Sequence, residues 1–330
     1  MIQFHQRRRT ILAFAASALA PFASLAQQPS SKIFRIGFMG AGSAAQMTSR
    51  VEALRRGLSD LGYVEGKNIV FEYRYADGKS ERYPILAAEL VRLNVDVLAT
   101  HAQGTAAAQR ATRTIPIVTA ATNDLVALGL VPSLARPSGN LTGGIFFTDE
   151  LGAKRIELLK ETIPGLTRVA LLLSANNNVA NPILLDVIAP TVKHLKVTMQ
   201  QILVREDANF ESAFADMAKQ RASALAIPDT PLFTLNAKTV AALALKHRLP
   251  LCGTPELAEA GGMLGYGVHI PAMFYRAAYF IDKILKGAKP GDIPIEQAAK
   301  FDCVVNMKTA KAIGVKIPGS IMIRATKVIE

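Results

Sequence analysis

The chain has 330 residues, half of them hydrophobic, and a formal net charge of +12 at pH 7. This length suits two domains with sizeable cores, and no segment is polar enough to predict disorder. Aromatic residues make up 6% of the chain and tryptophan is absent, which argues against a nucleic-acid surface built on base stacking. The basic residues are scattered rather than clustered, so we expect a solvated basic surface and no nucleic-acid partner.

Residues 1–26 have the pattern of an export signal. Three arginines precede the apolar stretch TILAFAASALA, and the sequence SLA at its end fits a small-x-small cleavage site. The apolar stretch is shorter than the about 20 residues that span a bilayer. We therefore expect cleavage after Ala26 and a mature protein in the periplasm. The arginine pair also resembles a twin-arginine signal, so both export routes stay open, as does retention of an uncleaved signal.

From residue 33 onward, short apolar runs alternate with amphipathic stretches, which is typical of βαβ units and a parallel sheet. In the first helix, Val51, Leu54, Leu58 and Leu61 share one face. The first half is predicted to hold strands and helices in alternation, at residues 33–40, 48–63, 68–76, 81–94, 95–101, 104–113 and 115–122.

The second half repeats this order, with a separation of 133 positions between Ile36 and Val169, and of 134 between Pro116 and Pro250. Such steady offsets indicate two similar lobes. The predicted elements of the second half, again beginning with a strand, are residues 167–175, 182–195, 196–204, 210–221, 222–229, 236–248 and 249–254.

Two glycine-rich segments, 136–150 and 261–271, are predicted linkers between the lobes. The later helix at 273–287 is not needed by the second repeat and is expected to return to the first lobe. The predicted fold is α/β, with two Rossmann-like lobes of parallel sheet joined by a multi-crossover hinge. The N-terminal lobe would comprise 33–143 and 272–300. The C-terminal lobe would comprise 144–271, while 301–330 could belong to either lobe.

The loop after the first strand, GAGSAA, resembles the G-x-G-x-x-G/A motif of dinucleotide-binding domains. Such a site needs an acidic residue about 20 positions on, at the end of the second strand. Asp77 lies 35 positions beyond Gly42, Asp60 falls inside a helix, and the following helix is predicted to begin several residues after the loop. We therefore expect no nicotinamide cofactor, and we expect the strand-end loops of both lobes to line one ligand cleft instead.

Several long stretches of the chain resemble a known protein family in the same order along the sequence. Three stretches resemble the solute-binding proteins of ABC transporters with a type I periplasmic-binding-protein fold. They are ALRRGLSDLGYVEGKNIVFEYRYADGKSERYPILAAELVRLNVDVL, IPIVTAATNDLVALGLVPSLARPSGNLTGG and RAAYFIDKILKGAKPGDIPIE. The similar group contains tryptophan- and tyrosine-type amino-acid binders, and the resemblance covers residues 33–330. It implies a cleft that closes on a small solute and delivers it to a membrane permease, without catalysis or cofactor. The loops SANNNVANP and PDTPLF depart from the family pattern, which leaves the ligand's identity open.

The resemblance also implies ligand-binding residues: hydroxyls and helix N-terminal amides from the first lobe, and an Asp of the second lobe for an amino group. Tyr266, in a Gly-flanked crossover, is a further candidate that could cover the ligand or pack the hinge. Carried over loop by loop, the implied residues are Ser43, Gly104, Thr105, Ala106, Asn123, Asp124, Asn176 and Asp229.

Each of these residues also has an ordinary structural alternative. Thr105 and Asp124 could simply cap helices, while Asp229 and Asn176 could form turns. His101 borders the predicted cleft and is a weaker candidate. The histidines do not cluster at metal-ligand spacing, so no metal site is predicted.

No G-x-S-x-G motif is present, so a secreted hydrolase has no nucleophile to name. Cys252 and Cys303 each adjoin an apolar run, which favours buried free thiols over a disulfide. We expect a monomeric, non-enzymatic binding protein that captures an amino acid or a related small carboxylate for an ABC importer. A ligand-sensing module of a receptor or regulator is the alternative, because this fold serves both roles.

Overall fold

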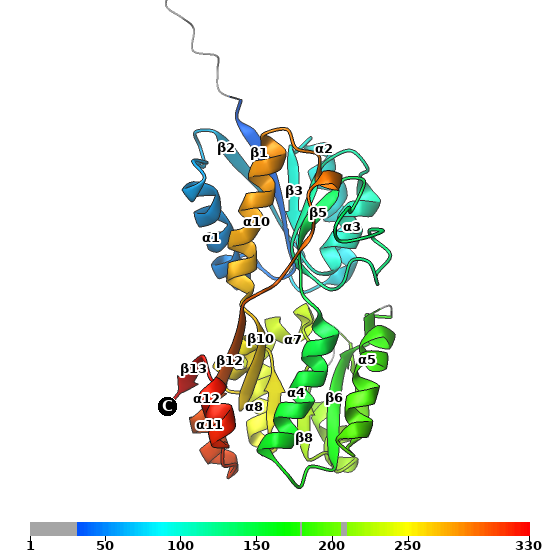
Figure 1. Ribbon diagram of the computed structural model, residues 1–330, viewed down its shortest axis with the longest axis vertical. Helices are drawn as coiled ribbons and strands as arrows, with labels where there is room; N and C mark the ends of the chain where they lie inside the picture. The colour runs from blue at the N-terminus through cyan, green and yellow to red at the C-terminus, as the bar shows by residue number, and fades with distance from the viewer. Residues whose placement is uncertain (1–31, 179, 206–209) are drawn as a thin grey trace, which may run out of the picture. The chain divides into compact units, whose positions relative to one another are not determined.

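The computed structural model describes residues 32–330 except 179 and 206–209, so the predicted export signal lies outside the described residues. Ile33–Glu330 forms one compact unit. Within it, two separate β-sheets, each covered by helices on both faces, define two lobes (Figure 1). Within the described residues, every helix is too short or too polar to cross a membrane.

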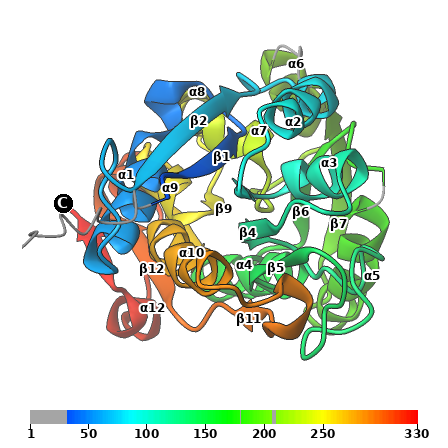
Figure 2. The ribbon, with the colours of Figure 1, turned by 90° about the horizontal axis from the view of Figure 1, so that it is seen from above.

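The first lobe is built on a six-stranded sheet in the order β11-β5-β4-β3-β1-β2. Helices α1 (Ala44–Asp60) and α10 (Ile270–Leu285) pack together on one face, and α2 (Tyr83–Arg92) and α3 (Gln103–Ala111) cover the other (Figure 2). A short 3₁₀ turn at Ser80–Arg82 precedes α2, and another lies at Pro290–Asp292. The strands are β1 (Phe34–Gly40), β2 (Ile69–Tyr75), β3 (Val97–Thr100), β4 (Ile117–Thr122), β5 (Leu141–Ile145) and β11 (Glu296–Gln297).

The second lobe is built on a seven-stranded sheet in the order β13-β12-β10-β9-β8-β6-β7. All its pairings are parallel except that of β10 with β12. The strands are β6 (Arg168–Ser174), β7 (Thr198–Val204), β8 (Ala224–Ala226), β9 (Leu251–Gly253), β10 (Leu264–Val268), β12 (Phe301–Asn306) and β13 (Lys327–Ile329).

Two apolar clusters hold the helices of the second lobe against this sheet, one on each face. One face carries α4 (Thr148–Thr162), α5 (Ala180–His194), α11 (Met307–Ile313) and α12 (Gly319–Arg324). The other carries α6 (Phe210–Lys219), α7 (Pro231–Leu235), α8 (Ala237–Lys246) and α9 (Pro255–Glu259).

The chain crosses between the lobes three times: from β5 into α4, from β10 into α10, and from β11 into β12 (Figure 1). Helix α10 packs against α1 and the first sheet. Residues 301–330, whose lobe the sequence left open, contribute β12 and β13 to the second sheet. The α/β fold of two mostly parallel sheets is confirmed.

Both predicted linkers contain a strand, β5 and β10, that the sequence analysis missed, and the first also runs into α4. The sequences LTGGI and LGYGV carry glycines where strand-forming side chains are expected. Gly143 has φ +134°, and a Cβ there would lie 2.0 Å from the carbonyl oxygen of Thr119. A Cβ on Gly265 would lie 2.7 Å from the carbonyl oxygen of Thr254. These glycines permit close backbone approach, which residue propensity does not reveal.

Helix α1 begins at Ala44, earlier than the predicted start at residue 48. Ser43 is its N-cap: the Ser43 hydroxyl accepts from the Gln46 amide, and the Gln46 side chain accepts from the Ser43 amide. This reciprocal capping box fixes the start of the helix. The loop that resembled a dinucleotide motif is therefore shorter than predicted.

The two cysteines lie on β9 and β12, with β10 between them in the sheet. Two strand spacings amount to about 9–10 Å, beyond the about 7 Å that a disulfide can bridge between Cα atoms. Both thiols are free and buried, and burial raises the pKa of Cys252 to about 12. Cys252 and Cys303 are thus core residues.

Candidate functional site

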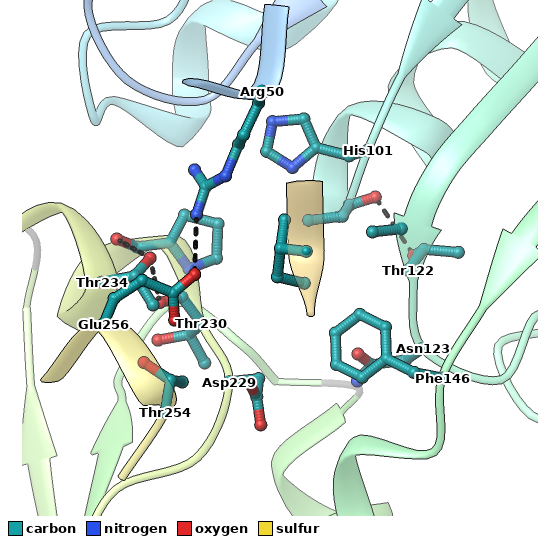
Figure 3. A pocket seen from close by; sticks show the side chains of 14 residues that line it. Arg50, His101, Thr122, Asn123, Phe146, Asp229, Thr230, Thr234, Thr254 and Glu256 are labelled. Atoms are coloured by element: carbon teal, nitrogen blue, oxygen red, sulfur yellow. Dashed lines mark hydrogen bonds and ion pairs between the residues drawn. The ribbon is translucent and has the colours of Figure 1, made fainter. Parts of the chain in front are cut away.

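Two adjoining cavities of about 60 and about 410 Å³ lie where the carboxyl ends of the two sheets' strands meet. Ligands of open parallel sheets bind at this edge. The first cavity is lined by residues of both lobes (Figure 3). The cavities share Ala102, Thr122, Asn123, Asp229, Thr230 and Pro231.

An ion pair joins the lobes across the smaller cavity. Arg50 Nη2, on α1 of the first lobe, lies 3.8 Å from Glu256 Oε1, on α9 of the second (Figure 3). The Arg50 side chain is 14% exposed, and desolvation lowers its pKa although the Glu256 carboxylate opposes this. The cavity therefore holds a nearly buried cation beside an anion.

His101, at the end of β3, is a neutral hydrogen-bond acceptor. Its Nε2 accepts from the Ala41 amide at 3.3 Å, and its ring packs in a T-shaped arrangement with that of Phe274, with centroids 5.3 Å apart. Burial, aided by the Arg50 charge, lowers its pKa to about 3. At neutral pH His101 adds polarity to the cavity without charge.

Asp229 lines both cavities, but its carboxylate faces a buried guanidinium. Arg155 Nη2 lies 2.6 Å from Asp229 Oδ2, and the two side chains are 0% and 9% exposed. Arg155 also donates to the carbonyl oxygens of Ile227 and Tyr266. Burial raises the pKa of Asp229, while the Arg155 charge acts in the opposite direction. Asp229 therefore has a structural partner inside its own lobe.

Three other predicted residues line the cavities. Asn123, after β4, borders both, whereas Ala106 of α3 and Asn176, after β6, line the larger one. The structure thus brings three residues that follow β3, β4 and β6, from two lobes, to one cavity. Their contact with a ligand stays a prediction.

Thr105 and Gly104 lie at the start of α3 but do not line either cavity. The Thr105 hydroxyl is fully buried and 2.9 Å from the hydroxyl of Thr119. A Cβ on Gly104 would lie 2.4 Å from Thr100 Oγ1, so the residue permits close packing of α3 against β3. Both positions hold the first lobe together.

Ser43 and Asp124 act as local caps. Besides the capping of α1 by Ser43, the Asp124 carboxylate accepts from the amides of Val126 and Ala127 at 2.8 and 3.3 Å. Neither residue lines the two cavities. For Asp124 this is the capping role considered as its structural alternative, whereas the capping role of Ser43 was not predicted.

Tyr266 lies at a crossover rather than at these cavities. Its ring stacks on Phe301, with centroids 6.3 Å apart and an interplanar angle of 8°. It lines a separate cavity of about 230 Å³ that also involves Phe146 and Phe147. This placement agrees with hinge packing, the second of the two roles considered for it.

The predicted ligand-binding residues do not include Arg50, Glu256 or Thr230. Glu256 and Thr230 fall in strand-end loops already expected at the cleft, so topology could have found them. Arg50 lies inside an amphipathic helix, where no local signal separates a cleft-facing arginine from a solvated one. Across the described residues, no three His, Cys, Asp or Glu side chains gather as metal ligands.

Comparisons with known proteins agree with this architecture. A tyrosine-binding protein of Clostridioides difficile (strain R20291) is 25% identical over 261 residues, covering 78% of this chain and 74% of that protein. The crystal structure of a conserved domain protein from Vibrio cholerae has a TM-score of 0.83 at 25% identity, covering 90% of this chain and 100% of its own. An ABC domain from Streptococcus pneumoniae in complex with L-Trp has a TM-score of 0.79 at 22% identity, covering 89% of this chain and 100% of its own.

The family model of ABC transporter substrate-binding proteins matches residues 42–329. This match spans both lobes and all three crossovers, so it applies to the whole two-lobe unit. The family resemblance noted in the sequence is confirmed, as is the type I periplasmic-binding-protein fold. The chain belongs to the family of ABC transporter substrate-binding proteins.

Proposed function

We propose that this protein captures a small solute with a carboxylate group, an amino acid or a related compound, in the two interlobe cavities. The observation that carries the proposal is the nearly buried Arg50 guanidinium in a cavity lined by both lobes. A planar guanidinium suits carboxylate recognition. Relatives named for tyrosine binding and solved with L-Trp support the same ligand class.

Capture follows from contacts that only the joined lobes can make. Gln46 Nε2 donates to the Leu235 carbonyl at 3.2 Å from one lobe to the other. A ligand held by both lobes adds to such contacts and shifts the population toward the closed state. Three neighbouring crossovers form the hinge about which the lobes would open. The closed form would then dock to the permease.

The cellular setting belongs to the same proposal. Residues 1–26 would direct export to the periplasm, where the mature, monomeric protein meets the membrane permease of an ABC importer. No catalytic step is part of this function, because release to the permease completes the cycle.

A thermal-shift screen tests the proposal directly. The protein is purified from residue 27 onward, which keeps the whole compact unit, and is screened against amino acids and organic acids. A ligand at 100 times its Kd stabilises the folded state by about 2.7 kcal/mol, which corresponds to a melting shift of roughly 5 °C. If no solute in a broad library raises the melting temperature, the proposed function is wrong.

A further inference from the structure

Arg50 and Glu256 face each other across the smaller cavity with little else to bind. Their separation of 3.8 Å is longer than a hydrogen bond, and the side chains are 14% and 33% exposed. The other contact shown for the Arg50 guanidinium is with Met47 Sδ, at 3.6 Å. A guanidinium has five N–H donors, so most of those of Arg50 lack a strong acceptor among the described residues.

The remaining ionisable groups of this cavity do not complement a charged ligand. Asp229 is paired with Arg155, and His101 is neutral. In the smaller cavity, Arg50 and Glu256 are therefore the charges left to a ligand, one positive from the first lobe and one negative from the second. The cavity is neutral in sum but strongly polarised.

A buried hydroxyl between the two cavities adds an independent sign of a polar ligand. Thr230 Oγ1 has no hydrogen-bond partner among the residues that the structure describes, and the residue is 9% exposed. Leaving a buried hydroxyl without a partner costs about 1–3 kcal/mol. A polar group of a ligand bound here would remove that cost.

We propose that Arg50 and Glu256 together recognise a zwitterionic α-amino-acid head group, with its carboxylate on Arg50 and its ammonium on Glu256. The inference rests on the proposed function and deepens it. A simple carboxylate would leave Glu256 facing like charge, and a simple amine would do the same to Arg50. Only a ligand with both charges satisfies both lobes, so head-group binding is coupled to closure.

The sizes of the cavities separate the head group from the side chain of the ligand. The smaller cavity, about 60 Å³, suits the head group, whereas the adjoining cavity of about 410 Å³ has room for the rest. Tyr83, Leu128 and Leu130 supply apolar surface there, whereas Arg110 and Asn176 supply a charged and a polar edge. Head-group recognition and side-chain selection would thus be carried by different residues.

Binding of matched ligand series tests the inference. Calorimetry measures each natural amino acid that shifts the melting temperature, together with its deamino carboxylic acid and its decarboxylated amine. Each analogue should bind at least about 30-fold more weakly than the amino acid, because one buried charge loses its partner. Equal binding of the deamino acid, or hits confined to carboxylates that are not zwitterions, would overturn the inference and leave the proposed function intact. No binding of any solute would overturn both.

Variants that remove one charge provide a second test of the inference. Arg50→Gln should lower the affinity for the amino acid and the affinity for its deamino acid alike, by about 30-fold or more. Glu256→Gln should weaken binding of the amino acid. It should also reduce the ratio of the amino-acid affinity to the deamino-acid affinity by about tenfold, because the repulsion between Glu256 and the carboxylate of the deamino acid is removed. Arg56→Gln on α1 and Glu259→Gln on α9 are the matched controls and should leave both affinities unchanged.

The Glu256→Gln result decides between a ligand contact and a structural ion pair. An equal loss for the amino acid and the deamino acid would show that Glu256 acts only by holding the lobes together, and would contradict the inference. If Arg50→Gln does not fold, Arg50→Lys keeps the charge while removing the planar fork, and the same ligand pair is measured.

Discussion

Asp229 is the counterion of Arg155, a fully buried arginine whose guanidinium lies 2.6 Å from it. Arg155 links Ile227, the residue after β8, to Tyr266 of β10 by donating to the carbonyl oxygens of both residues. The Arg155–Asp229 pair therefore connects a residue that lines both cavities to β10, the strand that leads into the crossover to α10. Removing one partner of a buried ion pair leaves an uncompensated charge.

Asp229→Asn should therefore lower the free energy of unfolding by about 3–5 kcal/mol, as measured by urea denaturation. Glu259→Gln is the control, because Glu259 forms an exposed pair with Lys327 at 2.7 Å and should cost less than about 1 kcal/mol. Similar losses for the two variants would show that Asp229 does not compensate Arg155.

His101 should make the protein less stable in mild acid. Its pKa is lowered to about 3 in the folded state, against about 6.5 in the unfolded chain, so the unfolded state binds a proton first as the pH falls. Its contribution is full above about pH 6.5 and is lost progressively down to about pH 3. Between pH 6.5 and 5.0 this amounts to about 2 kcal/mol.

Denaturation of the wild type and of His101→Gln at several pH values isolates this contribution. The difference between their unfolding free energies should shift in favour of the variant by about 2 kcal/mol from pH 6.5 to 5.0. A difference independent of pH would mean that His101 becomes protonated within the folded protein.

Thr105→Val should destabilise the first lobe without changing solute affinity. The substitution leaves the buried Thr119 hydroxyl without its partner, at a cost of about 1–3 kcal/mol. The double variant with Thr119→Val removes both hydroxyls and should be less destabilised than the sum of the single variants. A loss of affinity without a loss of stability would instead restore Thr105 as a ligand contact.

Gly57→Ala should destabilise the protein, although alanine normally favours a helix by about 1 kcal/mol. Gly57 lies where α1 packs on α10, and a Cβ there would approach the Tyr275 carbonyl oxygen to 2.5 Å. The helices must separate, which should cost about 1–3 kcal/mol.

Gly165→Ala is the matched control, because a Cβ at that position meets no atom within 4 Å. Thermal or urea unfolding of the two variants should therefore give a clear loss for Gly57→Ala and little change for Gly165→Ala. Equal stabilities would mean that the two helices can adjust without strain.

The α/β organisation and the family could be predicted from the sequence. Periodic apolar positions and repeated offsets are local or one-dimensional patterns, so they can be recognised in the sequence alone. The same signals placed the candidate residues in strand-end loops, and Asn123, Asn176, Ala106 and Asp229 do line the cavities.

Which of those residues already have partners, and which charges are left for a ligand, depends on the tertiary packing. Ser43, Asp124 and Thr105 have partners within the first lobe, and Asp229 has one in the second. The strands β5 and β10 escaped notice because their glycines are required by backbone contacts distant in sequence. Arg50 and Glu256 are 206 positions apart and lie in different lobes. Their pairing depends on how the two lobes pack, so no local sequence pattern predicts it.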